Sequence, residues 1–423
     1  MNITVKPSTP MGKIEAISSK SVAHRILICA AFADRDTVVR CDRTNKDIEA
    51  TAACLCALGA SILYEAPLFY VTPIKTPVDG AILPCNESGS TLRFLLPLVP
   101  ALGIKASFDM RGRLPERPLS PLYEELVAHG ASLSAQGSNP LVCTGALTGK
   151  EYRIRGDVSS QFISGLLFAL TFSGKGGRLI IEGETQSAPY IDMTVDALSL
   201  FGAAPEKTEY GYIIRENAKL CSPSKLVVEG DWSNAAFPLC MGAVGKGEVS
   251  VVGLSARSHQ GDRAIVDILR RFGADVTESN GVLTVKGGKA LCGIEIDASQ
   301  IPDMVPALAT VASVADGTTT IYGAARLRIK ESDRLMSVSA MLNALGADVT
   351  ETDDGLIIKG KKALSGGAVD CFNDHRIAMS ACVASAAATE DIVIRGAECA
   401  SKSYPDFWTD VRQHLGVQLN VES

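Results

Sequence analysis

The sequence predicts an α/β protein of two domains, each built from three copies of one helix-and-strand unit. Three observations lead to this prediction: a glycine signature recurs six times along the 423 residues, an apolar helix accompanies each copy, and a strand pattern follows the glycine. Six buried helices cannot easily share one core, because single cores stop growing near ~250–300 residues. A linear solenoid is the alternative, but solenoid repeats run only ~20–50 residues.

The signature ends an amphipathic helix in each copy. The apolar residues Ile265, Ile268 and Leu269 have helical spacing before one glycine. An acidic residue near most starts is the expected N-cap, and the glycine fits the left-handed position that ends a helix. The expected N-caps are Asp47, Asp262, Asp333 and Asp406, and the signature glycines are Gly59, Gly130, Gly202, Gly273, Gly346 and Gly416.

The strand pattern after the glycine indicates a hairpin. Residues 275–285 alternate around Asn280-Gly281, and residues 348–359 repeat the pattern around Asp354-Gly355. Asn-Gly and Asp-Gly are the usual two-residue turns of β-hairpins. Each unit is therefore expected to end in a helix followed by a hairpin.

A second helix in each unit is apolar nearly all round, which is typical of a buried helix. Segments 162–172 and 377–388 are examples. The expected starts lie near Ser21, Ser90, Ser160, Asn234, Asp303 and Asn373.

The starts of these buried helices collect polar residues. Ordinary capping explains Ser233 and Asn234. It does not explain Lys20, Arg25 and Arg376, because a cation at a helix start opposes the helix dipole. Since a helix start attracts anions, we expect a ligand with phosphate or carboxylate groups.

Composition excludes several classes of protein. Hydrophobic residues make up 46% and charged residues 21% of the chain, as in an ordinary folded protein. The longest apolar runs are too short to span a bilayer, and the first residues do not have the apolar core of a signal peptide. The net charge of −6 disfavours a general nucleic-acid binder. The twelve cysteines form no CxxC pair, so no zinc site is expected, and their apolar contexts suit a reducing cytosol.

Five motifs together carry a resemblance. The chain has RIKESDR at 328–334, NDHRIAM at 373–379, RLPERP at 113–118, SSQ at 159–161, and SKS at 19–21 followed by Arg25. A charge run such as 328–334 is by itself more often a solvated, self-paired surface. With all five motifs in this order, the sequence resembles the 5-enolpyruvylshikimate-3-phosphate synthase (3-phosphoshikimate 1-carboxyvinyltransferase) family of enolpyruvyl transferases over nearly its whole length.

The resemblance implies a two-domain inside-out α/β barrel of six helix-strand units, three per domain, with the active site in the interdomain cleft. Carried onto this chain, one domain spans residues 18–228. The other is discontinuous and joins residues 1–17 to 229–423.

The resemblance also implies a reaction in the shikimate pathway, which leads to chorismate and the aromatic amino acids. The enolpyruvyl group of phosphoenolpyruvate is transferred to the 5-hydroxyl of shikimate 3-phosphate by addition and elimination, and phosphate is released. No metal or organic cofactor is expected. We expect a cytoplasmic monomer whose partners are the two small substrates, and neither nucleic acid nor a membrane.

Site roles follow residue by residue from the resemblance. Asp303 is the expected base at the 5-hydroxyl, Glu331 the proton donor to the methylene carbon, and Lys20 the residue that touches both substrates. Tyr190 is expected beside the ring, and His375 is expected to support Arg376. Shikimate 3-phosphate is expected at Ser21, Arg25, Ser159, Ser160, Gln161, Ser187, Asp303 and Lys330. Phosphoenolpyruvate is expected at Lys20, Gly89, Arg113, Gln161, Arg334, Arg376 and Lys402.

Two positions depart from the family pattern. Glu87 stands where the family often has Asn, and Arg326 stands where some members have an Asn that touches shikimate 3-phosphate; neither is placed in the binding set.

Three rival interpretations stay open. A UDP-N-acetylglucosamine enolpyruvyl transferase would carry a cysteine in the loop at 113–118, and this loop has none. An RNA 3′-phosphate cyclase uses related units, but the acidic balance disfavours it. A catalytically dead anion-binding repeat protein would not need Asp303, Glu331 and Lys20 together.

Overall fold

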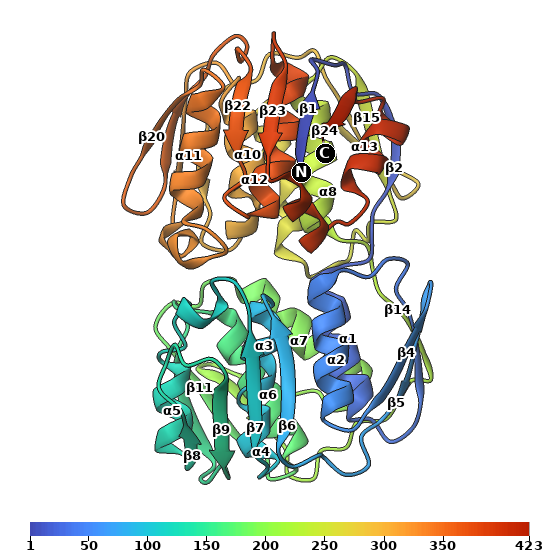
Figure 1. Ribbon diagram of the computed structural model, residues 1–423, viewed down its shortest axis with the longest axis vertical. Helices are drawn as coiled ribbons and strands as arrows, with labels where there is room; N and C mark the ends of the chain where they lie inside the picture. The colour runs from blue at the N-terminus through green and yellow to red at the C-terminus, as the bar shows by residue number, and fades with distance from the viewer. Residues whose placement is uncertain (423) are drawn as a thin grey trace. The chain divides into compact units, whose positions relative to one another are not determined.

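The computed structural model describes residues 1–422 as two compact units (Figure 1). Unit 1 joins Met1–Ile17 to Glu229–Ser423, and unit 2 is Ser18–Val228. Both units combine helices with sheets, so the predicted α/β class is confirmed. Among residues 1–422, no helix combines the length and the apolar character that crossing a membrane requires.

Unit 2 contains three sheets of four strands within the described residues, in the orders β14-β3-β5-β4, β6-β7-β9-β8 and β10-β11-β13-β12. In each sheet the first two strands pair in parallel and the other pairs are antiparallel. The strands are β3 Thr37–Arg40, β4 Ser61–Glu65, β5 Leu68–Thr72, β6 Ala81–Asn86, β7 Ala106–Met110, β8 Ala131–Leu133, β9 Leu141–Gly145, β10 Glu151–Arg155, β11 Gly177–Glu182, β12 Glu206–Thr208, β13 Gly211–Ile214 and β14 Lys225–Val227.

Unit 1 repeats this architecture with sheets β2-β15-β17-β16, β18-β19-β21-β20 and β22-β23-β1-β24. The N-terminal segment belongs to unit 1 because β1 lies between β23 and β24 and β2 pairs with β15. The strands are β1 Asn2–Val5, β2 Gly12–Glu15, β15 Glu248–Val252, β16 Asp275–Ser279, β17 Val282–Lys286, β18 Glu295–Asp297, β19 Thr318–Tyr322, β20 Asp348–Glu351, β21 Leu356–Lys359, β22 Gly367–Asp370, β23 Ile392–Arg395 and β24 Leu419–Glu422.

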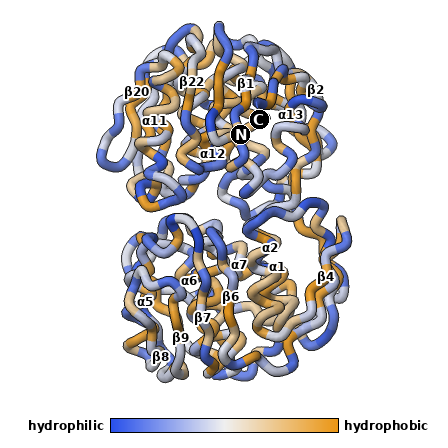
Figure 2. Tube along the Cα trace, viewed as in Figure 1, coloured by the Kyte–Doolittle hydropathy of each residue, from blue (hydrophilic) through white to orange (hydrophobic). Residues whose placement is uncertain are grey.

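The apolar helices lie in the core of each unit, as their composition predicts. Figure 2 shows hydrophobic residues along α1 and α6, for example. In the second repeat, Pro97 separates two short helices where the sequence predicts one. The core helices are α1 Lys20–Ala31, α3 Gly89–Leu95, α4 Leu98–Ala101, α6 Ser160–Phe172, α8 Trp232–Val244, α10 Val305–Ala312 and α12 His375–Ala384.

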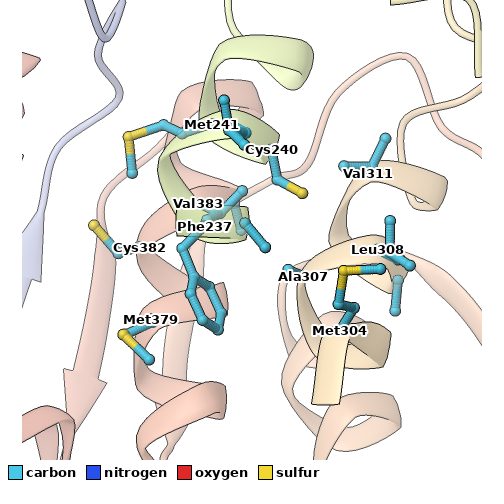
Figure 3. Packing of buried hydrophobic residues seen from close by; sticks show 14 of the residues in the cluster. Phe237, Cys240, Met241, Met304, Ala307, Leu308, Val311, Met379, Cys382 and Val383 are labelled. Atoms are coloured by element: carbon cyan, nitrogen blue, oxygen red, sulfur yellow. The ribbon is translucent and has the colours of Figure 1, made fainter. Parts of the chain in front are cut away.

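The core of unit 1 forms where α8, α10 and α12 pack against one another. Figure 3 shows buried side chains from all three helices, among them Phe237 and Cys240 of α8, Leu308 of α10, and Met379 and Val383 of α12. All five side chains are fully buried. Truncating a core phenylalanine to alanine costs about 3–5 kcal/mol, so this packing fixes the helix ends that carry the polar residues.

The amphipathic helices end as the signature predicts. The six signature glycines all have positive φ, between 66° and 112°, which suits glycine at a helix C-terminus. The helices are α2 Lys46–Ala57, α5 Leu122–Ala128, α7 Ala188–Leu200, α9 Ile265–Arg271, α11 Arg334–Ala344 and α13 Phe407–Leu415. Short 3₁₀ segments are η1 Leu114–Glu116, η2 Gly261–Ala264, η3 Pro302–Met304, η4 Ala325–Ile329, η5 Ser385–Ala387 and η6 Ala397–Lys402.

Three of the predicted caps need correction. The N-cap of α2 is Asn45 and not Asp47, because the Asn45 side chain accepts the backbone N–H of Ile48. Asp262 lies inside η2, and the N-cap position of α9 is Ala264. The N-cap of α8 is Asp231, so Ser233 and Asn234 lie inside the helix and do not cap it.

One of the two predicted hairpin turns also needs correction. The turn at Asn280-Gly281 has two residues, both with positive φ, as predicted. The loop before β21 has four residues and closes with the N–H of Thr352 donating to the carbonyl of Gly355.

Candidate active site

In unit 1 the candidate site is built around Asp303, which lies in η3 just before α10. One carboxylate oxygen, Oδ1, accepts from Nη1 of Arg334 at 3.0 Å, and Nζ of Lys330 lies 3.9 Å from the same atom. The other oxygen, Oδ2, accepts from Nη2 of Arg376 at 3.2 Å. The sequence motifs at 328–334 and 373–379 therefore meet on this aspartate.

Arg334 is a buried residue that connects the two motifs through hydrogen bonds. This first residue of α11 is 1% exposed. Its Nε donates to Oδ2 of Asp374 at 2.8 Å, and its Nη2 donates to Oε2 of Glu331 at 2.7 Å. A planar guanidinium can serve several carboxylates at once, so Arg334 fixes Asp303, Glu331 and Asp374 relative to one another.

The pKa values of Asp303 and Lys330 in this cluster are both lowered, but for different reasons. Burial disfavours the ionised form of Asp303, but the charges of Arg376, Lys330 and Arg334 outweigh burial and hold its pKa well below the usual range. Burial lowers the pKa of Lys330 to about 8, although Asp303 acts in the opposite sense. Asp303 is therefore an ionised acceptor at neutral pH.

Arg376 connects the cluster to α8. The guanidinium donates to the backbone carbonyl of Asp303 at 2.9 Å and to Oγ of Ser233 at 2.7 Å. Its own backbone N–H donates to Asp374, which caps α12. Burial, followed by the charge of Asp303, raises the pKa of Asp262 to about 6. Lys402, in η6, is also buried.

In unit 2 the first helix start holds an ion pair. Lys20, the first residue of α1, lies 2.9 Å from Oδ2 of Asp47 in the first turn of α2, and both side chains are largely buried. Arg25 is 2% exposed and donates to Oγ1 of Thr194, the carbonyl of Ser21 and the carbonyl of Tyr190. Arg25 therefore fixes Ser21 and Tyr190, two residues of the predicted site.

The starts of α3 and α6 lie together. Gln161, in the first turn of α6, donates from Nε2 to Oγ of Ser90 and accepts at Oε1 from Nη1 of Arg93. A Cβ atom on Gly89 would lie 2.6 Å from Nη1 of Arg93 and 2.8 Å from Nη1 of Arg117. Only glycine lets these two guanidinium groups approach the first turn of α3 so closely.

The remaining predicted residues of unit 2 occupy helix ends and a loop. Ser159 caps α6 by accepting the N–H of Gln161, and Ser160 begins the helix. Ser187, the residue before α7, is buried with a φ of 55°, and such a conformation in a residue other than glycine is often found at functional sites. Arg113 is about half exposed and pairs with Glu116 at 3.5 Å.

Four charged residues of these clusters were not predicted from the sequence as site residues. Asp47 is predicted only as a helix N-cap, and Asp374 stands inside the motif at 373–379 without a predicted role. Neither Arg93 nor Arg117 is assigned a role from the sequence. Of the two positions that depart from the family pattern, Arg326 donates to the carbonyl of Ser299. Within residues 1–422, no group of three or more His, Cys, Asp or Glu side chains is arranged to hold a metal ion.

Comparisons with known proteins agree on one family. The family model described as EPSP synthase (3-phosphoshikimate 1-carboxyvinyltransferase) matches residues 5–411. The 3-phosphoshikimate 1-carboxyvinyltransferase of Clostridium kluyveri is 42% identical over 428 residues, covering 99% of this chain and 98% of that protein. The protein of the same name from Methanocorpusculum labreanum is 36% identical over 426 residues, covering 100% of both.

Solved structures show the same architecture. The EPSP synthase of Acinetobacter baumannii superposes with a TM-score of 0.82 at 26% identity, covering 99% of this chain and 100% of that one. The enolpyruvyl transferase NikO of Streptomyces tendae superposes with a TM-score of 0.79 at 18% identity, covering 99% of this chain and 98% of that one, and supports the fold alone.

Proposed function

Because the chain belongs to the EPSP synthase (3-phosphoshikimate 1-carboxyvinyltransferase) family, we propose that it transfers the enolpyruvyl group of phosphoenolpyruvate to the 5-hydroxyl of shikimate 3-phosphate. The products are 5-enolpyruvylshikimate 3-phosphate and phosphate, on the route to chorismate. The observation that carries the proposal is the cluster in which Asp303 accepts from Arg334 and Arg376 beside Glu331. This cluster joins carboxylates for proton transfer to cations for acidic substrates.

Asp303 is the proposed base. Its neighbouring cations keep it ionised but also make it a weak base, because a low pKa means low proton affinity. When the phosphate and carboxylate groups of phosphoenolpyruvate pair with Arg334 and Arg376, part of that positive field is neutralised. The pKa of Asp303 then rises, so its basicity increases only when substrate is present.

Glu331 is the proposed acid that protonates the methylene carbon of phosphoenolpyruvate. Its Oε2 accepts from Arg334, which fixes the carboxyl group in the cluster. Lys330, the preceding residue, has a pKa lowered to about 8 by burial and stays mainly charged at neutral pH. It would pair with an anionic group of shikimate 3-phosphate.

Unit 2 supplies the second set of proposed contacts. Lys20 is proposed to touch both substrates, with Gly89, Arg113 and Gln161 on phosphoenolpyruvate. Gly89 and Gln161 lie beside Arg93, whose charge adds to the support for an anion at this helix start. Ser21, Arg25, Ser159, Ser160 and Ser187 are the proposed contacts of shikimate 3-phosphate, and Arg376 and Lys402 of unit 1 complete the phosphoenolpyruvate set. Both sets of residues are proposed to serve one reaction.

We propose that the enzyme works in the cytoplasm as a monomer. All twelve cysteines, which lie within residues 1–422, are present as thiols, and nine of them are buried, as suits a reducing compartment. Size-exclusion chromatography with light scattering tests the monomer.

A phosphate-release assay tests the reaction itself. The purified protein is mixed with phosphoenolpyruvate and either shikimate 3-phosphate or UDP-N-acetylglucosamine. Release only with shikimate 3-phosphate is the expected result. Release only with UDP-N-acetylglucosamine would overturn the proposal, and release with neither would favour a protein that binds anions without catalysis.

A further inference from the structure

A buried chain of hydrogen bonds crosses unit 2 beneath the starts of α1 and α3. Nδ1 of His24 lies 2.7 Å from Oγ1 of Thr51, and Oγ1 of Thr51 lies 2.6 Å from Oγ1 of Thr91. Thr91 donates its hydroxyl hydrogen to Oγ of Ser88 at 2.7 Å. All four side chains are at most 1% exposed, so water does not compete for these bonds.

The chain ends at a residue that shapes the proposed substrate contact. Ser88 caps α3, because its Oγ also accepts the backbone N–H of Thr91 at 3.3 Å. The next residue, Gly89, begins α3 and is a proposed contact of phosphoenolpyruvate. The rotamer of Ser88 therefore helps to fix the backbone that faces the ligand.

The chain begins one helical turn below Lys20. Lys20 and His24 are four residues apart on α1, and their partners Asp47 and Thr51 are four residues apart on α2. Residues at this spacing share a face of a helix. α1 and α2 are therefore joined by an ion pair and, one turn further along, by a hydrogen bond. The hydrogen bond continues through Thr91 to Ser88.

Each hydroxyl has a single hydrogen, and this fixes the direction of donation along the chain. Thr91 uses its hydrogen on Ser88, so the 2.6 Å contact between the two threonines requires Thr51 to donate to Thr91. Thr51 then has no hydrogen left for His24. The bond between them forms only if Nδ1 of His24 carries a hydrogen and donates it.

The other ring nitrogen gives an independent argument. Nε2 of His24 is buried and has no hydrogen-bond partner among residues 1–422. A buried N–H without a partner is costlier and rarer than an unused lone pair. The hydrogen therefore belongs on Nδ1, and burial lowers the pKa of the ring to about 3, which keeps it neutral.

We propose that neutral His24, in the Nδ1–H form, is a positioning residue whose donated hydrogen orients Thr51, Thr91 and the Ser88 cap, and thereby the Gly89 end of the phosphoenolpyruvate site. His24 does not itself touch substrate. The link to phosphoenolpyruvate rests on the proposed function, whereas the direction of donation along the hydrogen bonds from His24 to Ser88 rests on geometry alone.

The first test is spectroscopic and does not depend on catalysis. ¹⁵N-labelled histidine in the intact protein reports which ring nitrogen carries the hydrogen. The expected result is a neutral ring protonated at Nδ1 between pH 6 and 8. An Nε2–H ring would mean that the chain donates in the opposite direction, and an imidazolium would mean that the ring is charged; either would overturn the proposal.

The second test is kinetic and uses matched variants. Thr51→Val keeps the shape of the side chain but removes the central hydroxyl, and Thr51→Ser keeps the hydroxyl. We expect Thr51→Val and His24→Leu to raise the KM for phosphoenolpyruvate by about tenfold with kcat nearly unchanged, since roughly one uncharged hydrogen bond is lost. His24→Asn, which keeps a side-chain N–H donor, and Thr51→Ser should restore most of that loss.

His129→Leu is the control, because His129 is the other histidine of unit 2 and its two ring nitrogens lie 2.9 Å from the backbone carbonyls of Glu125 and Glu151. Its KM should stay at the wild-type value. An unchanged KM in Thr51→Val, or an equal rise in His129→Leu, would overturn the positioning role. If wild-type protein shows no turnover, the proposed function fails, and the nitrogen spectrum still decides the direction of donation along these hydrogen bonds.

Discussion

The two units share one architecture but place different chemistry at the starts of their buried helices. In unit 1, Arg334 and Arg376 bond three carboxylates directly, and the cluster is almost entirely ionic. In unit 2, hydroxyl and amide groups join the corresponding helix starts, for example at Gln161 and Ser90, together with the ion pair between Lys20 and Asp47. On the proposed function, unit 1 supplies the proton-transfer groups and their neighbouring charges, whereas unit 2 supplies mainly hydrogen-bonding groups.

The largest effect should follow from removing the proposed acid or base of unit 1. We expect Asp303→Asn and Glu331→Gln each to lower kcat by about 10²- to 10⁴-fold, because proton transfer by a positioned group contributes that much. Binding of shikimate 3-phosphate, measured by calorimetry, should persist, since the amides keep the size of the side chains. Glu351→Gln is the control, because Glu351 is also a carboxylate of unit 1 but pairs with the partly exposed Arg328.

Turnover within tenfold of wild type in either variant would remove that residue from its role. If Asp303→Asn alone left turnover unchanged, another residue would have to be the base. Glu331 would then remain the proposed proton-transfer group of unit 1.

The next effect concerns stability and distinguishes the ionic cluster from surface pairs. Arg334→Met should lower the free energy of unfolding by about 3–5 kcal/mol, because it leaves Asp374, Glu331 and Asp303 without their shared cation. Arg328→Met should cost at most about 1 kcal/mol, since Arg328 and its partners are about one-third exposed. Urea unfolding of both variants measures the difference.

Equal losses in the two arginine variants would contradict the view that burial makes the cluster of unit 1 special. The stability of unit 1 would then depend on the number of ion pairs and not on their burial.

Much of this comparison could be predicted from the sequence. The repeat, the apolar helices and the motifs at 328–334 and 373–379 place the predicted residues at successive helix starts. Pairing across helices could not be predicted, because it depends on side chains far apart in the sequence. Cations at helix starts suggested a bound anion, whereas the structure gives Lys20 and Arg376 protein carboxylates as partners, Asp47 and Asp303. Gly89 and Arg93 are four residues apart on α3, so their closeness is local, whereas the bond from Arg93 to Gln161 forms only because α3 and α6 pack together, which no local pattern reveals.

A third prediction uses pH to separate the uncharged chain of unit 2 from the charged cluster. Burial lowers the pKa of His24 from 6.5 to about 3. Between these pH values the unfolded chain therefore binds a proton at His24 that the folded chain does not bind. Stability must therefore fall as pH falls from about 6.5 toward 3, and the loss attributable to His24 is about 2 kcal/mol at pH 5.

Denaturant unfolding of wild type and His24→Asn at pH 8 and pH 5 measures this contribution as a difference between the two proteins. The difference matters because Asp262 of unit 1 acts in the opposite sense: its pKa is raised to about 6, so the folded state gains stability as pH falls through that value. An identical pH dependence in both proteins would show that His24 is charged or accessible in the folded state.

The smallest predicted effect tests how closely unit 2 approaches its ligand. Gly89→Ala adds a Cβ only 2.6 Å from Nη1 of Arg93 and 2.8 Å from Nη1 of Arg117, so both guanidinium groups must move. Gly89 has no positive φ, so the substitution strains contacts and not the backbone. Displacing these charges should raise the KM for phosphoenolpyruvate by about tenfold, the equivalent of about 1.4 kcal/mol of overpacking.

The affinity for shikimate 3-phosphate is the internal control, because Gly89 belongs only to the proposed phosphoenolpyruvate contacts. A KM for phosphoenolpyruvate that does not change would mean that Arg93 and Arg117 yield without loss of binding. A guanidinium group moves easily only where no hydrogen bond holds it. That result would therefore mean that the bond from Arg93 to Gln161 does not hold Arg93 in place. An equal loss of affinity for both substrates would instead show that Gly89 has a structural role in the whole of unit 2. Its effect could then not support the proposed difference in function between the two units.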